Sequence, residues 1–513
     1  MRLSSWLSVL LAVNFCVFCS AYELTSDPIP PDTSEQCLSC QDTIQEMYTE
    51  WTDPANVEAI LRDLKRQCRQ QQDKASKKVI CSKLAEVLVQ IPPGIFQGME
   101  DLAWPIPLAP CALIRQCKVQ CCAEQSPPEQ VHLSLPASND ADSAYWGVSW
   151  VTLDSNASVV VYGTDANNLN IKNVGTVDTY TQAGWVGTIH RAKMTDLKHS
   201  ETYYYSVGDG NKWSDVMSFR TFDQESQALT YAVIADMDFE QNDTVKQVNS
   251  LVDSGAIQAV IHSGDIGYAD GFEPHWDVFM NHVQPIASRI PYMVTPGNHE
   301  FWFNFSAYKH RFFMPGTIDE GGSGDNMFFS WNLGYTHFIA LNSETAVDTA
   351  NFAQDEIEWV QQNLAAVDRS KTPWIVAHFH RPMYCSSDHA CGDRDAEKLK
   401  EQMEDVFKEY GVDLVLSGHV HAYQRSFPVY KNEVTTMSYD SPDAPVYVMQ
   451  GASGNREGNK GSYPDPSELP DWSASTSVEI GYGVMSISAT ELSWEFHSSA
   501  TAEVLDQFVI TKR

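Results

Sequence analysis

The sequence predicts a multidomain protein in which a small, disulfide-bonded all-α domain precedes an all-β sandwich and an α/β domain of sheets flanked by helices. Three observations lead to this division. Cysteines are concentrated in the first part of the chain, short β-rich runs follow without intervening helices, and strand-like and helix-like segments then alternate. The chain has 513 residues, 43% of them hydrophobic, so it can bury more than one core. We place the three domains at residues 33–122, 127–223 and 228–513.

The N-terminus has the pattern of a secretory signal peptide, which we place at residues 1–21. Arg2 supplies a positive charge, an apolar stretch follows over 7–17, and small residues precede a cleavage site near Ala21. No later run has the length and apolar character of a membrane-spanning helix. These features predict a secreted protein, or a lysosomal or vacuolar one that uses the same route. N-glycosylation sequons agree with that route and begin at Asn156, Asn242 and Asn304.

Six cysteines of the first domain indicate a disulfide framework. They are Cys37, Cys40, Cys68, Cys81, Cys111 and Cys117. In an oxidising compartment such a density is typical of small cross-linked domains, although spacing alone leaves many pairings open. The alternative is a zinc site built on Cys37 and Cys40, but a second close pair at zinc-ribbon spacing is missing and exported thiols would oxidise.

The order of these cysteines, with a close pair, two middle residues and a final close pair, resembles the saposin B-type domains over residues 33–121. The resemblance implies bonds from Cys37 to Cys117, from Cys40 to Cys111 and from Cys68 to Cys81, and contact with a lipid surface. A basic cluster between residues 65 and 78 suits such a surface and is equally consistent with a solvated helix face. Cys121 and Cys122 lie outside the pattern, and their partners stay open.

The second domain reads as a β-sandwich. Short β-rich runs begin at Val131, Ser143, Ala157 and Glu201, and polar turns separate them. The arrangement resembles a fibronectin-type sandwich. Because no ligand-rich segment surrounds His132 or His190, we expect these two histidines to be strand residues and the domain to act as a scaffold.

The third domain alternates strands and helices. Apolar runs of buried-strand type cover residues 229–234, 259–262, 292–294, 336–341, 374–377 and 412–416. Helical candidates cover residues 244–252, 275–286, 355–366 and 395–410, the last with Gly411 as its C-cap. In open α/β sheets the functional groups gather beyond the carboxyl ends of the strands.

Seven potential metal ligands follow these apolar runs. They are Asp236, Asp265, Tyr268, Asn298, His380, His419 and His421. The two oxygens of Asp265 can bridge two cations, and a pair of cations is suited to hydrolysing phosphate esters. A phenol ionises near pH 10 when unperturbed, so Tyr268 as a ligand indicates a hard, highly charged cation such as Fe(III).

The ligands occur in an ordered series of motifs: Asp236, then Gly-Asp-x-x-Tyr, then Gly-Asn-His-Glu, then a strand-end His, then Gly-His-x-His. In this order residues 128–513 resemble the large, plant-type purple acid phosphatases. The resemblance implies an Fe(III) ion bound by Asp236, Tyr268 and His421. It also implies a second, divalent ion (Zn, Fe or Mn) bound by Asn298, His380 and His419. Asp265 would bridge the two ions.

Three positions depart from that family's pattern. The family's first motif usually reads Asp-x-Gly. Here it reads Asp236-Met-Asp238, which adds a carboxylate near the site. His378 competes with His380 for the ligand role, and we prefer His380 because the residues that follow it match the family. Of the substrate-facing histidines that the family has after this motif, His389 alone remains, between Cys385 and Cys391, which a disulfide could join.

The predicted activity is hydrolysis of phosphate monoesters, with metal-bound hydroxide as the nucleophile. His299 would bind the phosphate or protonate the leaving oxygen, and His389 would assist. A second possibility for His299 is a hydrogen bond that orients Asn298. The formal charge of −33 argues against a nucleic-acid partner and favours an acidic working pH.

Two other functions are consistent with parts of the sequence. One is a secreted lipid phosphodiesterase similar to acid sphingomyelinase, which also joins a saposin domain to a metallophosphoesterase domain. That family lacks the tyrosine ligand, so Tyr268 argues against it. The other is a lipid-binding protein with an inactive phosphatase-like domain. In that case some of the metal ligands should be absent from the sequence, and none is plainly missing. The physiological substrate and the oligomeric state stay open.

Overall fold

The computed structural model describes residues 119–122, 126–135, 145–155, 157–223, 228–239, 241–316, 322–345, 350–388, 391, 393–459 and 462–513. The predicted signal peptide, the saposin-like domain with its six paired cysteines, Asn156 and His389 lie outside these residues. Contacts within the chain define two compact units, and the larger comprises Cys121–Tyr180 and Val186–Arg513. Cys121 and Cys122 are buried, and neither is bonded to a cysteine that the structure describes.

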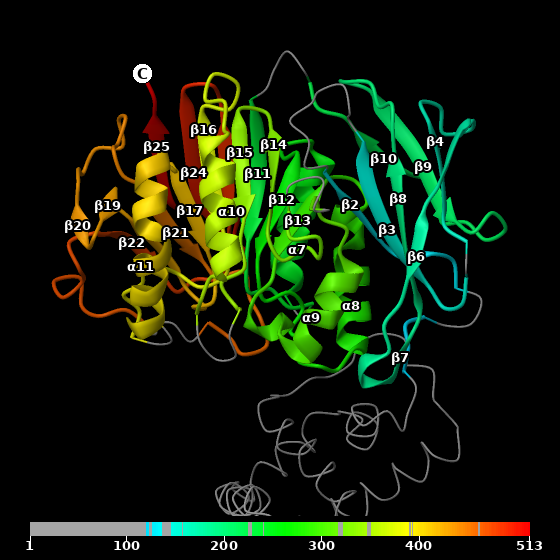
Figure 1. Cartoon of the computed structure of the whole chain (residues 1–513), viewed down its shortest axis with the longest axis horizontal. Coiled ribbons are helices and arrows are strands. Elements are labelled where there is room, and N and C mark those ends of the chain that lie inside the picture. The colour runs from blue at the N-terminus through cyan, green and yellow to red at the C-terminus, as the bar shows by residue number, and fades with distance from the viewer. Residues whose placement is uncertain are drawn as a thin grey trace, which may run out of the picture. The chain divides into compact units, whose positions relative to one another are not determined.

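Residues 129–220 form two antiparallel four-stranded sheets, labelled at the right of Figure 1. One sheet has the order β2 (Glu129–Ser134), β3 (Trp146–Thr152), β8 (Thr188–Met194), β6 (Thr176–Asp178). The other has the order β10 (Met217–Arg220), β9 (Thr202–Gly208), β4 (Val159–Gly163), β5 (Ile171–Val174). Trp146 stacks on Phe219 across the two sheets with ring centroids 4.5 Å apart. His132 and His190 are buried strand residues, as expected from the sequence.

Outside the sandwich, β1 (Val119–Gln120) pairs with β7 (Trp185–Val186), and η3 (Gln182–Gly184) precedes β7.

From residue 229 onwards, two mixed sheets form the α/β part of the protein. The six-stranded sheet has the order β13 (Tyr292–Thr295), β12 (Ala259–Ser263), β11 (Leu229–Ile234), β23 (Gly481–Ile487), β24 (Glu491–Ser498), β25 (Val504–Thr511). The seven-stranded sheet has the order β14 (Phe329–Leu333), β15 (Thr336–Ala340), β16 (Trp374–His378), β17 (Leu414–Ser417), β21 (Val446–Gln450), β18 (Tyr423–Ser426), β22 (Ser473–Ser477). A separate pair joins β19 (Val429–Tyr430) to β20 (Glu433–Val434).

The central strands of both sheets run parallel. They are β11, β12 and β13 in one sheet and β15, β16, β17 and β21 in the other. The sheets face each other through aromatic side chains, since Phe338 of β15 lies 5.1 Å from Tyr231 of β11 between ring centroids. Phe338 also stacks on Trp331 at 4.8 Å. Packed aromatic rings therefore fill part of the core between the sheets.

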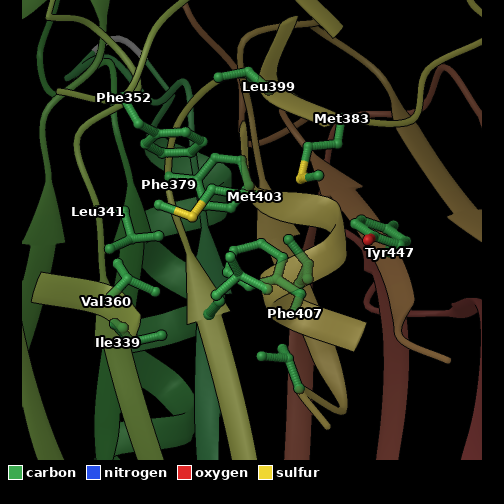
Figure 2. Packing of buried hydrophobic residues seen from close by; sticks show 14 of the residues in the cluster. Ile339, Leu341, Phe352, Val360, Phe379, Met383, Leu399, Met403, Phe407 and Tyr447 are labelled. Carbon is green, nitrogen blue, oxygen red and sulfur yellow. The ribbon is translucent and has the colours of Figure 1, made fainter. Parts of the chain in front are cut away.

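Helices cover the outer faces of these sheets. They are α7 (Asn242–Asp253), α8 (Pro274–Ala287), α9 (Trp302–Arg311), α10 (Gln354–Ala365) and α11 (Asp393–Tyr410), with the short η4 (Asn298–Glu300) before α9. Figure 2 shows how α10 and α11 pack on the seven-stranded sheet. Phe407 and Met403 of α11 meet Phe379 and Ile339 in one fully buried cluster. None of the helices among the described residues is both long and apolar enough to cross a membrane.

A buried polar network joins the sandwich to the α/β part. Arg311 of α9 donates to Asp277 at 2.8 Å and to the hydroxyl of Tyr180 at 2.8 Å. Gln130 of β2 donates to the same Asp277 carboxylate at 3.0 Å. Because these buried polar groups are paired, they favour a single arrangement of the sandwich against the α/β part.

The α/β fold and the sheet-rich domain before it are confirmed. The predicted strand at 229–234 matches β11, and the four predicted helices correspond to α7, α8, α10 and α11 with ends displaced by one or two residues. Neither α9 nor the antiparallel strands from β22 to β25 were predicted from the sequence. In α9, three residues beginning at Phe303 have positive φ, so the regular helical period is interrupted near the start of the helix. In β25, the apolar residues Val504, Leu505 and Val509 are exposed, so the sequence does not alternate apolar and polar residues in step with burial.

We expect Phe407→Ala to lower the free energy of unfolding by about 3–5 kcal/mol, because the ring is fully buried and its removal leaves a cavity. Urea denaturation followed by tryptophan fluorescence measures the change. The matched control is Glu401→Ala on the exposed face of the same helix, which should stay within about 0.5 kcal/mol of the wild type. Equal stabilities of the two variants would contradict this account of the core.

Candidate metal centre

Candidate ligands follow the carboxyl ends of parallel strands in both sheets. In the six-stranded sheet Asp236 follows β11, Asp265 follows β12 and Asn298 follows β13. In the seven-stranded sheet His380 follows β16 and His419 follows β17. Parallel strands present these ends at one edge of a sheet. Contacts between the two sets, from Asp265 to His380 and from Asp236 to His419, show that the two edges coincide.

The first donor cluster surrounds the carboxylate of Asp265. Its Oδ2 atom lies 3.1 Å from Nε2 of His380. That same Nε2 atom lies 3.1 Å from Oδ1 of Asn298 and 3.3 Å from Nδ1 of His419. One donor atom from each of Asp265, His380 and His419 lies within 4.8 Å of the others. Carboxylate and amide oxygens beside imidazole nitrogens fit a divalent transition-metal ion.

The second donor cluster consists of Tyr268, Asp236 and His421. The Tyr268 hydroxyl donates to Oδ1 of Asp236 at 3.3 Å and lies 3.0 Å from Nε2 of His421. The other oxygen of Asp236 accepts the backbone N–H of His419 at 2.8 Å, which joins the two clusters. A phenol, a carboxylate and an imidazole in this arrangement fit a hard cation of high charge. The structure thus brings all seven predicted ligands together.

Four of these seven residues have a left-handed backbone. The φ angle is 56° at Asp236, 53° at Asp265, 48° at Tyr268 and 71° at His419. Residues other than glycine adopt this conformation rarely, at a cost of roughly 1–3 kcal/mol each. Such a concentration of strain in one place indicates a functional requirement, because packing alone would not select it.

Glu300 holds the loops that carry Asp265 and Asn298. Its carboxylate accepts the backbone N–H groups of Asp265 at 2.9 Å, Ile266 at 2.9 Å and Gly297 at 2.8 Å. A Cβ atom at Gly297 would lie 2.2 Å from Oδ1 of Asp265, so this close approach requires glycine. The buried carboxylate therefore fixes both loops against each other.

The protonation states of the site depend on its charges. Burial lowers the pKa of His380, but the carboxylates of Asp265 and Asp236 outweigh burial and raise the pKa to about 9. Burial and the positive charge of Arg381 lower the pKa of His419 well below its usual range. Burial and the Asp236 carboxylate raise the pKa of Tyr268. The acids of the site therefore favour the protonated form of His380, whereas burial and Arg381 favour the neutral form of His419.

The two histidines at the end of β16 and just beyond it have different surroundings. His380 belongs to the donor cluster, and its Nδ1 atom lies 3.1 Å from the carbonyl of Ser263. His378 instead packs edge-on against Trp331, with ring centroids 5.4 Å apart. The geometry therefore favours His380 as the ligand and makes His378 part of the core.

Asp238 is buried and turned toward Arg456 rather than toward the donor clusters. Its Oδ2 atom lies 3.8 Å from Nε of Arg456, and Oδ1 accepts the backbone N–H of Phe239 at 2.6 Å. Burial raises the pKa of Asp238 to about 6, against the opposing charge of Arg456.

His299 lies beside the first cluster. Its Nδ1 atom lies 2.6 Å from Oδ1 of Asp270, and its backbone N–H donates to Oδ1 of Asp265 at 3.0 Å. Its Nε2 atom lies 3.8 Å from Oδ2 of Asp265 and 3.8 Å from a carboxylate oxygen of Glu457. The ring is thus held through Nδ1, while Nε2 faces the donor atoms.

Several charged residues that support the ligands were not predicted from the sequence. Nη1 of Arg381 lies 3.2 Å from Nε2 of His419, and Nε of Arg381 donates to Glu344 at 2.9 Å. Arg456 and Glu457 lie in the segment that follows the carboxyl end of β21. Identification of β21 as a parallel strand would have drawn attention to these two residues.

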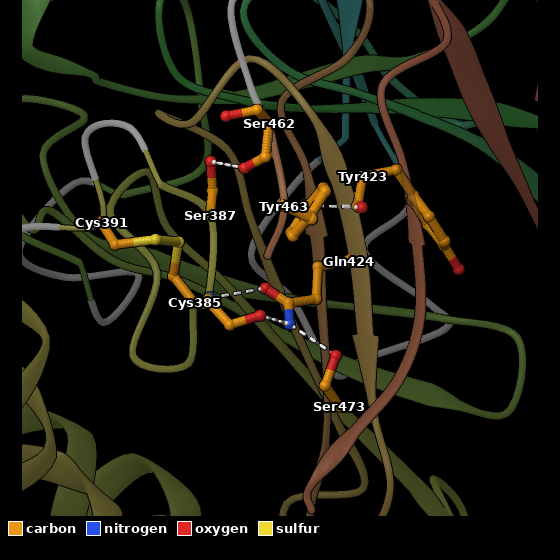
Figure 3. Close-up of a disulfide and its surroundings, with 9 residues drawn as sticks. Cys385, Ser387, Cys391, Tyr423, Gln424, Ser462, Tyr463 and Ser473 are labelled. Atoms are coloured by element: carbon orange, nitrogen blue, oxygen red, sulfur yellow. Dashed lines mark hydrogen bonds between the residues drawn. A yellow bond between two sulfur atoms is a disulfide. The ribbon is translucent and has the colours of Figure 1, made fainter. Parts of the chain in front are cut away.

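A disulfide joins Cys385 to Cys391 in the loop after His380 (Figure 3). The loop is also tied to its surroundings, because the Ser386 N–H donates to Gln424 at 2.9 Å and the Ser387 hydroxyl donates to the Ser462 carbonyl at 2.9 Å. The disulfide that the sequence allowed between these cysteines is therefore present.

Comparison with known families agrees with this fold and site. The purple acid phosphatase N-terminal domain matches residues 128–221, the calcineurin-like phosphoesterase domain matches residues 229–423, and the iron/zinc purple acid phosphatase-like protein C domain matches residues 444–507. The α/β part with its strand-end donors is thus a metallophosphoesterase domain.

Individual relatives define the family more closely. Acid phosphatase type 7 of Danio rerio is 33% identical over 419 residues, which cover 75% of this chain and 91% of the relative. Probable purple acid phosphatase 20 of Arabidopsis thaliana is 33% identical over 380 residues, 72% of this chain and 84% of the relative. A purple acid phosphatase from yellow lupin (Lupinus luteus) seeds has the same fold, with a TM-score of 0.64 at 23% identity over 75% of this chain and 74% of its own. The chain belongs to the purple acid phosphatase family.

The variant Cys385→Ser/Cys391→Ser should lose about 2 kcal/mol of unfolding free energy, because a short cross-linked loop removes limited entropy from the unfolded chain. Urea denaturation under non-reducing conditions measures the difference. A midpoint equal to that of the wild type would show that the loop's hydrogen bonds alone are sufficient.

Proposed function

We propose that this protein hydrolyses phosphate monoesters with two metal ions held by the two donor clusters. The observation that carries the proposal is the convergence of the seven donors at one edge of two sheets, with His419 shared between the clusters through its ring and its backbone N–H. Asp236, Tyr268 and His421 would hold Fe(III), and Asn298, His380 and His419 would hold a divalent ion. Asp265 would bridge them. When bound, two such ions bind the phosphate and lower the pKa of a water molecule.

The residues of the chain supply orientation and proton transfer around that centre. Asp270 fixes the ring of His299 through Nδ1, so Nε2 is available to bind the phosphate or to protonate the leaving oxygen. Arg381 holds the ring of His419 from the far side. His389 is proposed to assist from the disulfide-closed loop.

We also propose that the protein follows the secretory route and works at acidic pH. The signal-like N-terminus and the exposure of Asn242 and Asn304 support the route, since sequons must be accessible to be glycosylated. The saposin-like cysteine pattern supports contact with a lipid surface. The excess of 67 acidic over 34 basic residues would repel anionic substrates less when carboxylates are protonated.

The purified protein should hydrolyse simple phosphate monoesters at acidic pH, and Asp265→Asn should lower kcat by at least about 100-fold because a bridging ligand is lost. Elemental analysis should show reduced metal content in that variant. Asp405→Asn on the exposed face of α11 is the matched control and should keep both properties. Preferential hydrolysis of sphingomyelin would instead favour the lipid phosphodiesterase.

A visible absorption band from tyrosinate bound to Fe(III) should be present in the oxidised wild type and absent in Tyr268→Phe. The control is Tyr308→Phe, which alters another fully buried tyrosine outside the donor clusters and should keep the band. If the wild type binds iron but has no such band, the assignment of Fe(III) to Tyr268 is wrong.

A further inference from the structure

We infer that Arg456 is a positioning residue for the proposed reaction, acting on His299 through Asp270. This inference rests on the proposed function of His299 at the phosphate. Arg456 follows β21, at the edge where the donor residues gather, and its side chain is only 5% exposed. No substrate contact is required of it. Its role is to hold the group that makes the contact.

The guanidinium of Arg456 contacts several elements at once. It donates to Oδ2 of Asp270 at 2.6 Å, to the backbone carbonyl of Tyr268, and to Nδ1 of His275 in α8 at 3.0 Å. Its Nε atom lies 3.8 Å from Oδ2 of Asp238. Arg456 therefore connects the loops after β11, β12 and β21 with α8.

Asp270 links Arg456 to His299 and so fixes the orientation of the His299 ring. One oxygen of its carboxylate is held by Arg456, and the other lies 2.6 Å from Nδ1 of His299. With both oxygens engaged, the carboxylate cannot rotate, and the imidazole is directed so that Nε2 lies 3.8 Å from Oδ2 of Asp265. The ring also packs against Tyr268, with centroids 4.3 Å apart.

Charge balance makes arginine necessary at this position. Asp238 and Asp270 are two acids in a site that is already rich in carboxylates, and Asp238 is fully buried. A buried carboxylate without a partner is costly, so removal of the guanidinium would drive one of these groups to move. Lysine carries the charge but lacks the planar fork that reaches several acceptors in fixed directions.

The alternative is that Arg456 forms a structural ion pair and has no influence on the reaction. The two roles differ in how they depend on the leaving group. An aryl ester such as p-nitrophenyl phosphate needs little protonation of its leaving oxygen, whereas an alkyl ester such as glycerol 2-phosphate needs much. Loss of a positioned proton donor therefore slows the alkyl ester more. Loss of general stability slows both esters equally.

The test compares Arg456→Met, Arg456→Lys, Asp270→Ala, His299→Ala and the double variant Arg456→Met/His299→Ala as full-length, metal-loaded proteins. We expect Arg456→Met and Asp270→Ala to lower kcat/KM by about 100-fold for the alkyl ester and by less than about tenfold for the aryl ester. Arg456→Lys should recover only part of the loss. In the His299→Ala background, Arg456→Met should cause little further loss for either ester.

Arg425→Met is the matched control, because Arg425 is another buried arginine and pairs with Asp506 at 2.7 Å outside the donor clusters. It should lower the melting temperature without changing the ratio of the two esters. Metal content should be unchanged in all of these variants.

Three results would overturn the inference. The first is an equal loss on both esters in Arg456→Met. The second is a loss that adds fully to that of His299→Ala. The third is a crystal structure of Arg456→Met in which the His299 ring keeps its wild-type position, and this readout applies even if the wild type fails to hydrolyse monoesters. Such inactivity of the wild type would refute the proposed function separately.

Discussion

The parallel pairing of the central strands in both sheets is the constraint on which the rest of the structure depends. Parallel pairing places the carboxyl ends of β11, β12 and β13 at one edge, and those of β16, β17 and β21 at the same edge of the facing sheet. Residues separated by nearly two hundred positions, such as Asp236 and His419, thereby come within 2.8 Å of each other. Because the two sheets pack on each other through buried aromatic rings, they can hold the donor atoms in conformations that isolated loops would not adopt. The left-handed φ angles of four candidate ligands are the clearest sign of this.

The sequence was sufficient to predict the parts of the fold that depend on continuous apolar runs. Strands such as β11 and β12 are buried, and each begins with a run in which apolar residues predominate. Five of the seven candidate ligands then follow as the first polar residue with suitable chemistry beyond a strand, and Tyr268 and His421 lie a few residues further on. In contrast, β25 is exposed on alternate residues and α9 contains left-handed residues, and neither has the regular pattern by which such elements are found.

The supporting residues of the site were harder to predict for a different reason. A ligand can be identified by its own chemistry, but the role of Asp270, Glu300 or Arg456 depends on which atoms face it after folding. Glu300 is one residue from His299 in sequence, yet it binds backbone N–H groups whereas His299 faces the donor atoms. The distinction between His378 and His380 is similar, because His378 is the last residue of β16 and His380 lies two residues beyond it, so the end of the strand separates their surroundings.

The unusual aspartate at position 238 and the arginine at position 456 are best understood as one feature. Asp238 adds a buried negative charge where the resembled motif has glycine, and the nearest opposite charge is that of Arg456. Asp238 alone would be an unpaired buried carboxylate, and its pKa is raised even with the guanidinium present. Arg456 without Asp238 would still hold Asp270 and the Tyr268 carbonyl, but it would lose the opposite charge that lies 3.8 Å from its Nε atom. The additional carboxylate is therefore turned to the arginine behind His299. A departure that seemed to perturb the ligands instead forms an ion pair with a residue that supports them.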